Sequence, residues 1–136
     1  MGKKKIVGLI EGIGVDVVDT HRMKSVLEKQ GAVFVDKVFT KKEIAYCRSR
    51  KTPHEHFAAR FAAKEAVSKA MQTGWSGKFR WKDVEVVNEP SGAPRIFLDG
   101  EVSKALKHHA LHISLSHSEN TVVAFVVIER VSASQK

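Results

Sequence analysis

The segment from Thr52 to Thr73 constrains the fold more than any other part of the chain. It opens with Thr-Pro-His-Glu, in which threonine is a preferred N-cap, proline suits the first helical position and Glu55 can complete a capping box. Gly74 follows, and glycine is typical of the residue that ends a helix. Alanine fills positions 58, 59, 62, 63, 66 and 70. The pattern predicts a long central helix with a thin surface that another element can approach closely.

The remaining elements are predicted from caps, turns and alternation. Asp19 or Thr20 can cap a helix that stops at Gly31, Thr40 opens a capping box for a helix towards Arg50, and Asp99 caps a fourth. Strands are expected at 6–18, 84–86, 94–98, 112–116 and 121–128, the second and third forming a hairpin. The run 122–128 is apolar on both faces, which is typical of a central strand. The predicted class is α+β, with a mainly antiparallel sheet packed against the long central helix.

Size and composition limit the classes of protein that are possible. The 136 residues suit one domain, residues 1–136, and 43% hydrophobic with 28% charged residues are enough to fold. The apolar run 122–128 is far too short to cross a bilayer, and residues 1–5 lead into too short an apolar patch for a signal peptide. We therefore expect a cytoplasmic protein without a membrane partner. A single cysteine, Cys47, excludes an internal disulfide and is interpreted as a small buried hydrophobic residue.

The charge balance indicates an acidic partner. Twenty-three Lys and Arg residues against fifteen Asp and Glu give a net charge of +8. Nucleic acid, nucleotide phosphates and an acidic protein all satisfy this charge, and so does a solvated basic surface with no partner. The cations are spread along the chain apart from Lys3–Lys5 and 48–51, so no basic tail favours nucleic acid.

One carboxylate lies in an apolar setting, in the segment Gly12-Ile13-Gly14-Val15-Asp16. Burying Asp16 there is costly unless it is paired or binds a cation. The Gly-x-Gly pattern alone is a weak signal for a phosphate loop, because the full glycine fingerprint and the P-loop lysine are absent. A structural turn is the alternative interpretation.

The predicted central helix carries a second group of polar side chains. Phe61, Glu65 and Lys69 share one face, and the cations Arg60 and Lys64 share the next. One interpretation is an exposed Glu65–Lys69 pair, worth a few tenths of a kcal/mol. The other is a metal-binding carboxylate beside phosphate-binding cations, the groups that phosphoryl transfer requires.

Histidines form the third group. His117 lies at the end of the strand that contains Ser114 and Ser116, where it can act as an acid–base group, bind phosphate or simply bond to Ser118 in the turn. The pairs 54/56 and 108/112 have spacings that allow zinc ligation, but no cysteine cluster accompanies them, and we do not expect a zinc site.

Together these segments resemble the 4′-phosphopantetheinyl transferase family, in particular its small bacterial trimeric members, the holo-acyl-carrier-protein synthases. The family's Gly-Ile-Gly-x-Asp strand matches Gly12–Asp16 and is followed by Arg22. Its helix Arg-Phe-Ala-Ala-Lys-Glu-Ala-x-x-Lys-Ala matches Arg60–Ala70 at every stated position. Its Ser-x-Ser-His motif matches Ser114–His117, ahead of an apolar strand. The matches follow the family's order and spacing over nearly the whole chain.

The resemblance implies an enzyme of fatty acid biosynthesis that moves phosphopantetheine from coenzyme A to a serine of apo acyl carrier protein, with Mg²⁺ as cofactor. It implies a homotrimer with active sites between subunits. Asp16 and Glu65 are expected to hold the metal, and with Lys69 to form the catalytic group. Mg²⁺ suits such a pair, since it takes a few carboxylates together with waters and substrate phosphates. Either Glu65 or a metal-bound water would remove the serine proton.

The resemblance also assigns binding roles. Four residues are expected to contact coenzyme A: Arg60, Lys69, Ser116 and His117. Three are expected to dock an acidic carrier protein: Arg22, Lys29 and Lys37. A charge of +8 would then steer the encounter with that partner. A basic nucleic-acid-binding module and an inactive oligomeric scaffold are the rival functions; intact Asp16, Glu65 and Lys69 argue against the scaffold, and no nucleic acid partner is expected.

Overall fold

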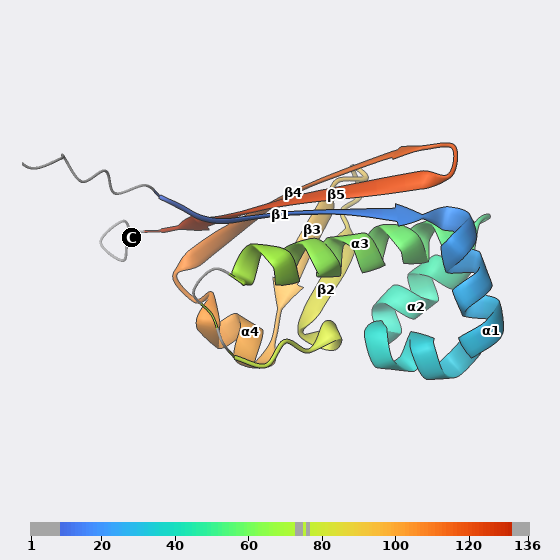
Figure 1. Cartoon of the computed structure of the whole chain (residues 1–136), viewed down its shortest axis with the longest axis horizontal. Helices are drawn as coiled ribbons and strands as arrows, with labels where there is room; N and C mark the ends of the chain where they lie inside the picture. The colour runs from blue at the N-terminus through green and yellow to red at the C-terminus, as the bar shows by residue number, and fades with distance from the viewer. Residues whose placement is uncertain (1–8, 73–74, 76, 132–136) are drawn as a thin grey trace, which may run out of the picture.

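The computed structural model describes residues 9–72, 75 and 77–131 (Figure 1). Its elements are β1 (Ile10–Asp19), α1 (Thr20–Val38), α2 (Lys41–Arg48), α3 (Pro53–Met71), a 3₁₀ turn η1 (Trp81–Asp83), β2 (Val84–Asn88), β3 (Pro94–Leu98), α4 (Gly100–Ala105), β4 (His109–Ser118) and β5 (Thr121–Arg130). The predicted α+β class is confirmed. In this described part of the chain, no helix has the length and apolarity needed to cross a membrane.

Two antiparallel sheets are present. The larger has the strand order β1-β5-β4, so the apolar strand β5 is central, as predicted. The smaller is the predicted hairpin of β2 and β3. Figure 1 shows α3 running along one face of the larger sheet, with the other helices beyond it and the hairpin crossing behind α3, so that one end of the hairpin approaches β4.

The contact between β1 and α3 is unusually close. A Cβ atom added at Gly12 would collide with the carbonyl oxygen of Ala70, and one added at Gly14 with the carbonyl oxygen of Ala66. Both glycines are buried, and the two alanines are at most 2% exposed. The glycines of β1 and the alanines of α3 therefore let the two backbones touch. The thin helix surface expected from the sequence has this purpose.

Replacing Gly14 by alanine should destabilise the fold by about 1–3 kcal/mol, the usual cost of forcing extra volume into a packed interior. The methyl group would have to displace the backbone of α3 at Ala66. Urea unfolding followed by circular dichroism measures the free energy. Ser118→Thr adds the same methyl group at an exposed position of β4 and should change it by less than about 0.5 kcal/mol. Equal stability of the two variants would contradict the close contact.

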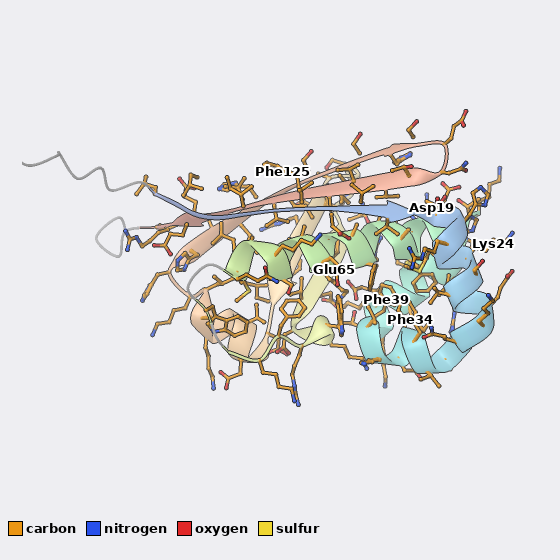
Figure 2. All side chains as sticks on the ribbon, viewed as in Figure 1. Asp19, Lys24, Phe34, Phe39, Glu65 and Phe125 are labelled. Carbon is orange, nitrogen blue, oxygen red and sulfur yellow. The ribbon has the colours of Figure 1, made fainter. Side chains whose placement is uncertain are left out.

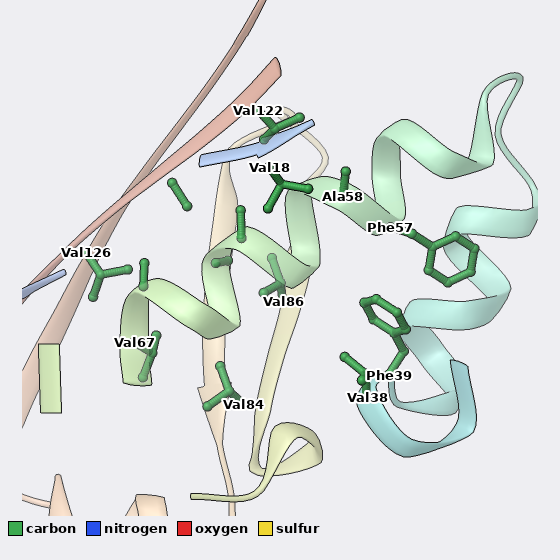
Figure 3. Close-up of a cluster of buried hydrophobic side chains, with 14 of the residues drawn as sticks. Val18, Val38, Phe39, Phe57, Ala58, Val67, Val84, Val86, Val122 and Val126 are labelled. Atoms are coloured by element: carbon green, nitrogen blue, oxygen red, sulfur yellow. The ribbon is translucent and has the colours of Figure 1, made fainter. Parts of the chain in front are cut away.

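The apolar core surrounds α3 on both sides. Val122 and Val126 come from β5, Val67 from α3, and Val84 and Val86 from β2, and each is at most 3% exposed (Figure 3). Fully burying a side chain of this size contributes about 1.5–3 kcal/mol relative to leaving it in water. The sheet and the hairpin are thus held to opposite sides of one helix.

A buried ion pair joins α3 to the elements beyond it. Lys64 and Glu43 are 0% and 1% exposed, and their charged atoms lie 2.9 Å apart. Lys64 also donates to the carbonyl oxygens of Trp81, at 2.9 Å, and Val84. Glu43 accepts from the backbone N–H of Val86 at 2.8 Å. The interpretation that includes Lys64 among phosphate-binding cations is wrong. Its ammonium group is buried and binds Glu43 and two backbone carbonyl oxygens.

Lys64→Met should destabilise the protein by about 3–5 kcal/mol, because it leaves the carboxylate of Glu43 buried without its partner charge. Burial already lowers the pKa of Lys64, and the charge of Glu43 opposes that shift. The double variant Lys64→Met/Glu43→Gln should recover part of the loss, since it removes the unpaired buried charge, although the single amide oxygen can accept only one of the two backbone hydrogen bonds that the carboxylate accepts. Urea denaturation gives both values. A single variant as stable as the wild type would contradict this role.

Two helix boundaries differ from the predictions. Helix α1 does not stop at Gly31. Its helical geometry is interrupted there, with φ 53° and ψ −131°, and then continues to Val38. Val35 and Val38 are buried, so the second half of the helix packs into the core. The side chain of Thr52 makes no capping hydrogen bond, because its backbone (φ −124°, ψ 79°) is outside the usual N-cap geometry. The expected helix end at residues 73–74 lies outside the described residues.

The other predicted caps are confirmed. The side chain of Asp19 accepts from the N–H of Arg22 at 3.0 Å and begins α1. Thr40 and Glu43 form the complete capping box of α2. Asp99 caps α4 through the N–H of Gly100. Local sequence therefore fixes where these helices begin.

Candidate active site

Asp16 lies on the inward side of β1, between the outward-facing Val15 and Val17. Its carboxylate is 13% exposed and lies 2.9 Å from the ammonium group of Lys69 on α3. Lys69 also donates to the carbonyl oxygen of Val15 at 3.2 Å, and its side chain is 46% exposed. The hydrogen bond to Asp16 raises the pKa of Lys69. The carboxylate of Asp16 therefore has a partner charge, and the side chain of Lys69 is still partly exposed to solvent.

Glu65 lies one helical turn before Lys69 and is half-buried. Burial raises the pKa of its carboxyl group, the charge of Asp16 raises it further, and Lys69 opposes these effects. Two carboxylates from distant parts of the sequence are therefore close enough to repel each other. The simple Glu65–Lys69 surface pair does not form, since the ion pair that Lys69 makes within the described chain is with Asp16.

A cleft of about 580 Å³ opens beside these two carboxylates. Asp16 and Glu65 line it from β1 and α3, and Arg22 lines it from the first turns of α1. Phe34 and Phe61 supply an apolar wall; Figure 2 labels Glu65 and Phe34 in this region. We call this the carboxylate cleft. It combines negative charge, an exposed cation and an apolar surface in one open space.

Arg60 and His117, two of the expected coenzyme A contacts, line a second cavity of about 270 Å³. Arg60 is 3% exposed, lies 4.3 Å above the ring of Tyr46 and donates to the side-chain oxygen of Asn88 at 2.7 Å. Its Nε atom is buried without a hydrogen-bond partner in the described structure. Thr121 lines both cavities, so they adjoin.

Ser116 lies elsewhere, on the outer face of the larger sheet, where it pairs in register with Val123 of β5. This face is largely apolar and is not covered by any described part of the chain. Ile13, Val15, Val17 and Phe125 are between 42% and 61% exposed on it. We call it the outer sheet face. The four expected coenzyme A contacts are thus in three places: Lys69 beside Asp16, Arg60 and His117 in the second cavity, and Ser116 on the outer sheet face.

The three expected carrier-docking residues are all exposed on α1. Arg22 lines the carboxylate cleft, and Lys29 follows seven residues later, two turns along the same side. Lys37 lies beyond the break at Gly31 and lines a separate hollow together with residues 78–83. Only Arg22 is therefore next to the carboxylates.

Sequence reasoning missed His56 and Tyr46, which line the second cavity beside Arg60. Burial lowers the pKa of His56, and the charges of Arg60 and Arg50 lower it further. Its spacing of four residues from Arg60 on one helix is a signal that indicated a shared face. Tyr46 comes from α2, and nothing in its local sequence indicated this contact.

Cys47 is the small buried hydrophobic residue that was predicted. It is 0% exposed, and burial raises the pKa of its thiol to about 12. The reactive thiolate is therefore strongly disfavoured at neutral pH.

Comparison with known proteins identifies the family. Residues 12–126 match the model of the 4′-phosphopantetheinyl transferase superfamily. The chain is 40% identical over 124 residues to a holo-[acyl-carrier-protein] synthase of Koribacter versatilis, covering 89% of this chain and 99% of that protein. It is 44% identical over 133 residues to a protein of the same name from Methylobacterium radiotolerans, covering 93% and 98%.

Solved structures have the same fold. The crystal structure of the holo-[acyl-carrier-protein] synthase from Neisseria meningitidis matches with a TM-score of 0.80 at 34% identity, over 89% of this chain and 99% of that one. That of the holo-(acyl-carrier-protein) synthase from Bacillus anthracis, in complex with CoA (3′,5′-ADP), matches with a TM-score of 0.74 at 35% identity, over 89% and 97%. The chain therefore belongs to the 4′-phosphopantetheinyl transferase superfamily and, within it, to the holo-[acyl-carrier-protein] synthase family.

Proposed function

We propose that this chain transfers the 4′-phosphopantetheine group of coenzyme A to a serine of an apo acyl carrier protein, giving the holo carrier and adenosine 3′,5′-bisphosphate. The observation that carries the proposal is the gathering of Asp16, Glu65 and Lys69 from β1 and α3 beside an open cleft. The names of the relatives and the coenzyme A complex of the Bacillus anthracis protein support the same reaction. We assign it to the chain as one transferase domain, working in the cytoplasm in fatty acid biosynthesis.

The donor set of the carboxylate cleft fits Mg²⁺. Asp16 and Glu65 would hold the ion, because two carboxylates that repel each other form a site that a divalent cation relieves. Among the residues that the structure describes, no group of three His, Cys, Asp or Glu side chains gathers into a closed cage. An open site suits Mg²⁺, which keeps several waters and also takes substrate phosphates. When bound, the ion would neutralise charge on the pyrophosphate of coenzyme A.

The chain's own side chains supply the other steps. The serine oxygen attacks the phosphorus that carries the pantetheine, and the bond from that phosphorus to the bisphosphate breaks with its electron pair. Glu65 is our candidate for accepting the serine proton, because its carboxylate lines the cleft in which the serine would lie. The exposed ammonium of Lys69 is placed to bind phosphate oxygens. We assign Arg60, Ser116 and His117 to coenzyme A, and Arg22, Lys29 and Lys37 to the acidic carrier.

We further propose that the active protein is a homotrimer with composite active sites. The outer sheet face supports this, because exposed apolar surface of this kind marks an interaction site. The separation of Ser116, on that face, from Arg60 and His117 gives the same indication. Packing the outer sheet faces of three subunits around a common axis would cover this apolar surface and place Ser116 of each subunit in an interface.

Glu65→Gln should lower the rate of transfer at least about 100-fold, because the amide lacks the negative charge that would bind the metal ion and cannot accept the serine proton. Mass spectrometry of an apo acyl carrier protein, incubated with coenzyme A and Mg²⁺, measures the gain of phosphopantetheine. Circular dichroism should report an intact fold. Glu101→Gln, at an exposed position of α4, is the matched control and should be fully active. A variant at residue 65 that turns over like the wild type would remove Glu65 from the catalytic group.

Phe125→Asp should break the trimer, because it places a charge in the middle of the outer sheet face, where Phe125 is 42% exposed in the single chain. Sedimentation equilibrium should give the mass of three chains for the wild type and of one for the variant, with loss of transfer. Val33→Asp makes the same change at a 79% exposed position of α1 and should leave the mass unchanged. An active monomeric wild type would contradict composite sites.

A further inference from the structure

The segment Lys78–Lys82, with the sequence Lys-Phe-Arg-Trp-Lys, alternates cations with aromatic side chains as it leads into β2. Its three cations are exposed, and its two aromatic side chains are half-buried. The rings of Phe79 and Trp81 meet edge to face at 5.6 Å, and Trp81 stacks on Phe61 of α3 at 5.2 Å. The aromatic residues therefore anchor the segment to the core, which fixes the cations on the outside.

Lys37 of α1 joins these cations at a shallow hollow of about 350 Å³. We call Lys37, Lys78, Arg80 and Lys82 the basic strip. Asp83 is the single acidic side chain among the described residues that line the hollow. None of the four cations forms an ion pair with another described residue. Four positive charges that repel one another and lack acidic partners form a surface that attracts an anion.

An aromatic path connects the basic strip to the carboxylate cleft. Phe34 and Phe61 line the cleft, with ring centroids 5.8 Å apart, and Trp81 of the hollow stacks on Phe61. Phe34 and Glu65 are both labelled in Figure 2, on the side of α3 away from the sheet. The strip and the cleft are therefore two ends of one surface, whereas the outer sheet face lies on the other side of α3 (Figure 1). A partner seated in the cleft can reach the strip without disturbing the proposed trimer.

We propose that the basic strip is a second contact surface for the acyl carrier protein and binds carboxylates of the carrier while its serine occupies the carboxylate cleft. This inference rests on the proposed function. The four cations are exposed and spread over two elements, which suits a row of carboxylates on another protein. A dedicated phosphate site instead brings converging donors to one buried point. Exposed charge pairs of this kind act mainly on encounter with the partner, and salt screens them.

The test compares two triple variants that lose the same charge. Lys78→Gln/Arg80→Gln/Lys82→Gln neutralises the strip, whereas Arg48→Gln/Lys51→Gln/Lys107→Gln removes three exposed cations that no proposed contact uses. Steady-state transfer to the organism's own apo acyl carrier protein is measured at several salt concentrations. We expect kcat/KM for the carrier to fall about tenfold in the strip variant and less than about twofold in the control. The KM for coenzyme A should not change, and the salt dependence of the strip variant should be weaker.

Each result decides between explanations. Equal losses in the two variants would overturn the inference, because they would show that only net charge matters. An increase in the KM for coenzyme A would overturn it in favour of a phosphate site. Retention of duplex DNA by the wild type but not by the strip variant, with carrier kinetics unchanged, would assign the strip to nucleic acid. A wild type that modifies no carrier would contradict the proposed function itself. If the wild type is active and the two triple variants lose the same activity, only the inference about the basic strip fails.

Discussion

The contact between two backbones, that of β1 and that of α3, determines where every proposed catalytic group lies. Gly12 and Gly14 lack the Cβ atoms that would hold the strand away from Ala66 and Ala70. The next inward residue of the strand is Asp16, and the residues adjoining these alanines on the helix include Glu65 and Lys69. Two short backbone approaches therefore place three charged side chains within reach of one another, without any loop to position them.

Helix α3 serves three purposes on three of its sides. Its alanines meet the sheet, Lys64 faces the buried carboxylate of Glu43, and Glu65 lines the cleft while Lys69 pairs with Asp16 at the surface. The ion pair and the glycine contact act on opposite sides of the helix, and together they fix its rotation about its own axis. Adjacent residues of one motif, Lys64 and Glu65, thus have different roles, structural and chemical.

Local sequence predicted the elements well, because caps and turns depend on residues within a few positions of each other. The capping box at Thr40 and the Asp19 cap are such cases. The role of Lys64 could not be predicted, since helix periodicity placed it beside Arg60 but its partner comes from another helix. Gly31 was expected to end a helix, yet packing of Val35 beyond it restored the helix. At Lys64 and Gly31, contacts with residues distant in the sequence determine the structure, and local patterns could not predict them.

Strand β5 has apolar residues on both faces, and contacts within the single chain account for only one of them. Apolar residues on both of its faces predicted a central position, and the order β1-β5-β4 confirms it. That position accounts for only one face, on which Val122 and Val126 pack against α3. The other face carries Phe125 next to Val15 in the register, and both remain exposed. A strand that is apolar on the side its own chain leaves uncovered is best explained by a partner there, and this same face holds Ser116, which we have proposed as a coenzyme A contact. The proposed trimer would therefore explain together the uncovered face and the separation of Ser116 from the other proposed coenzyme A contacts.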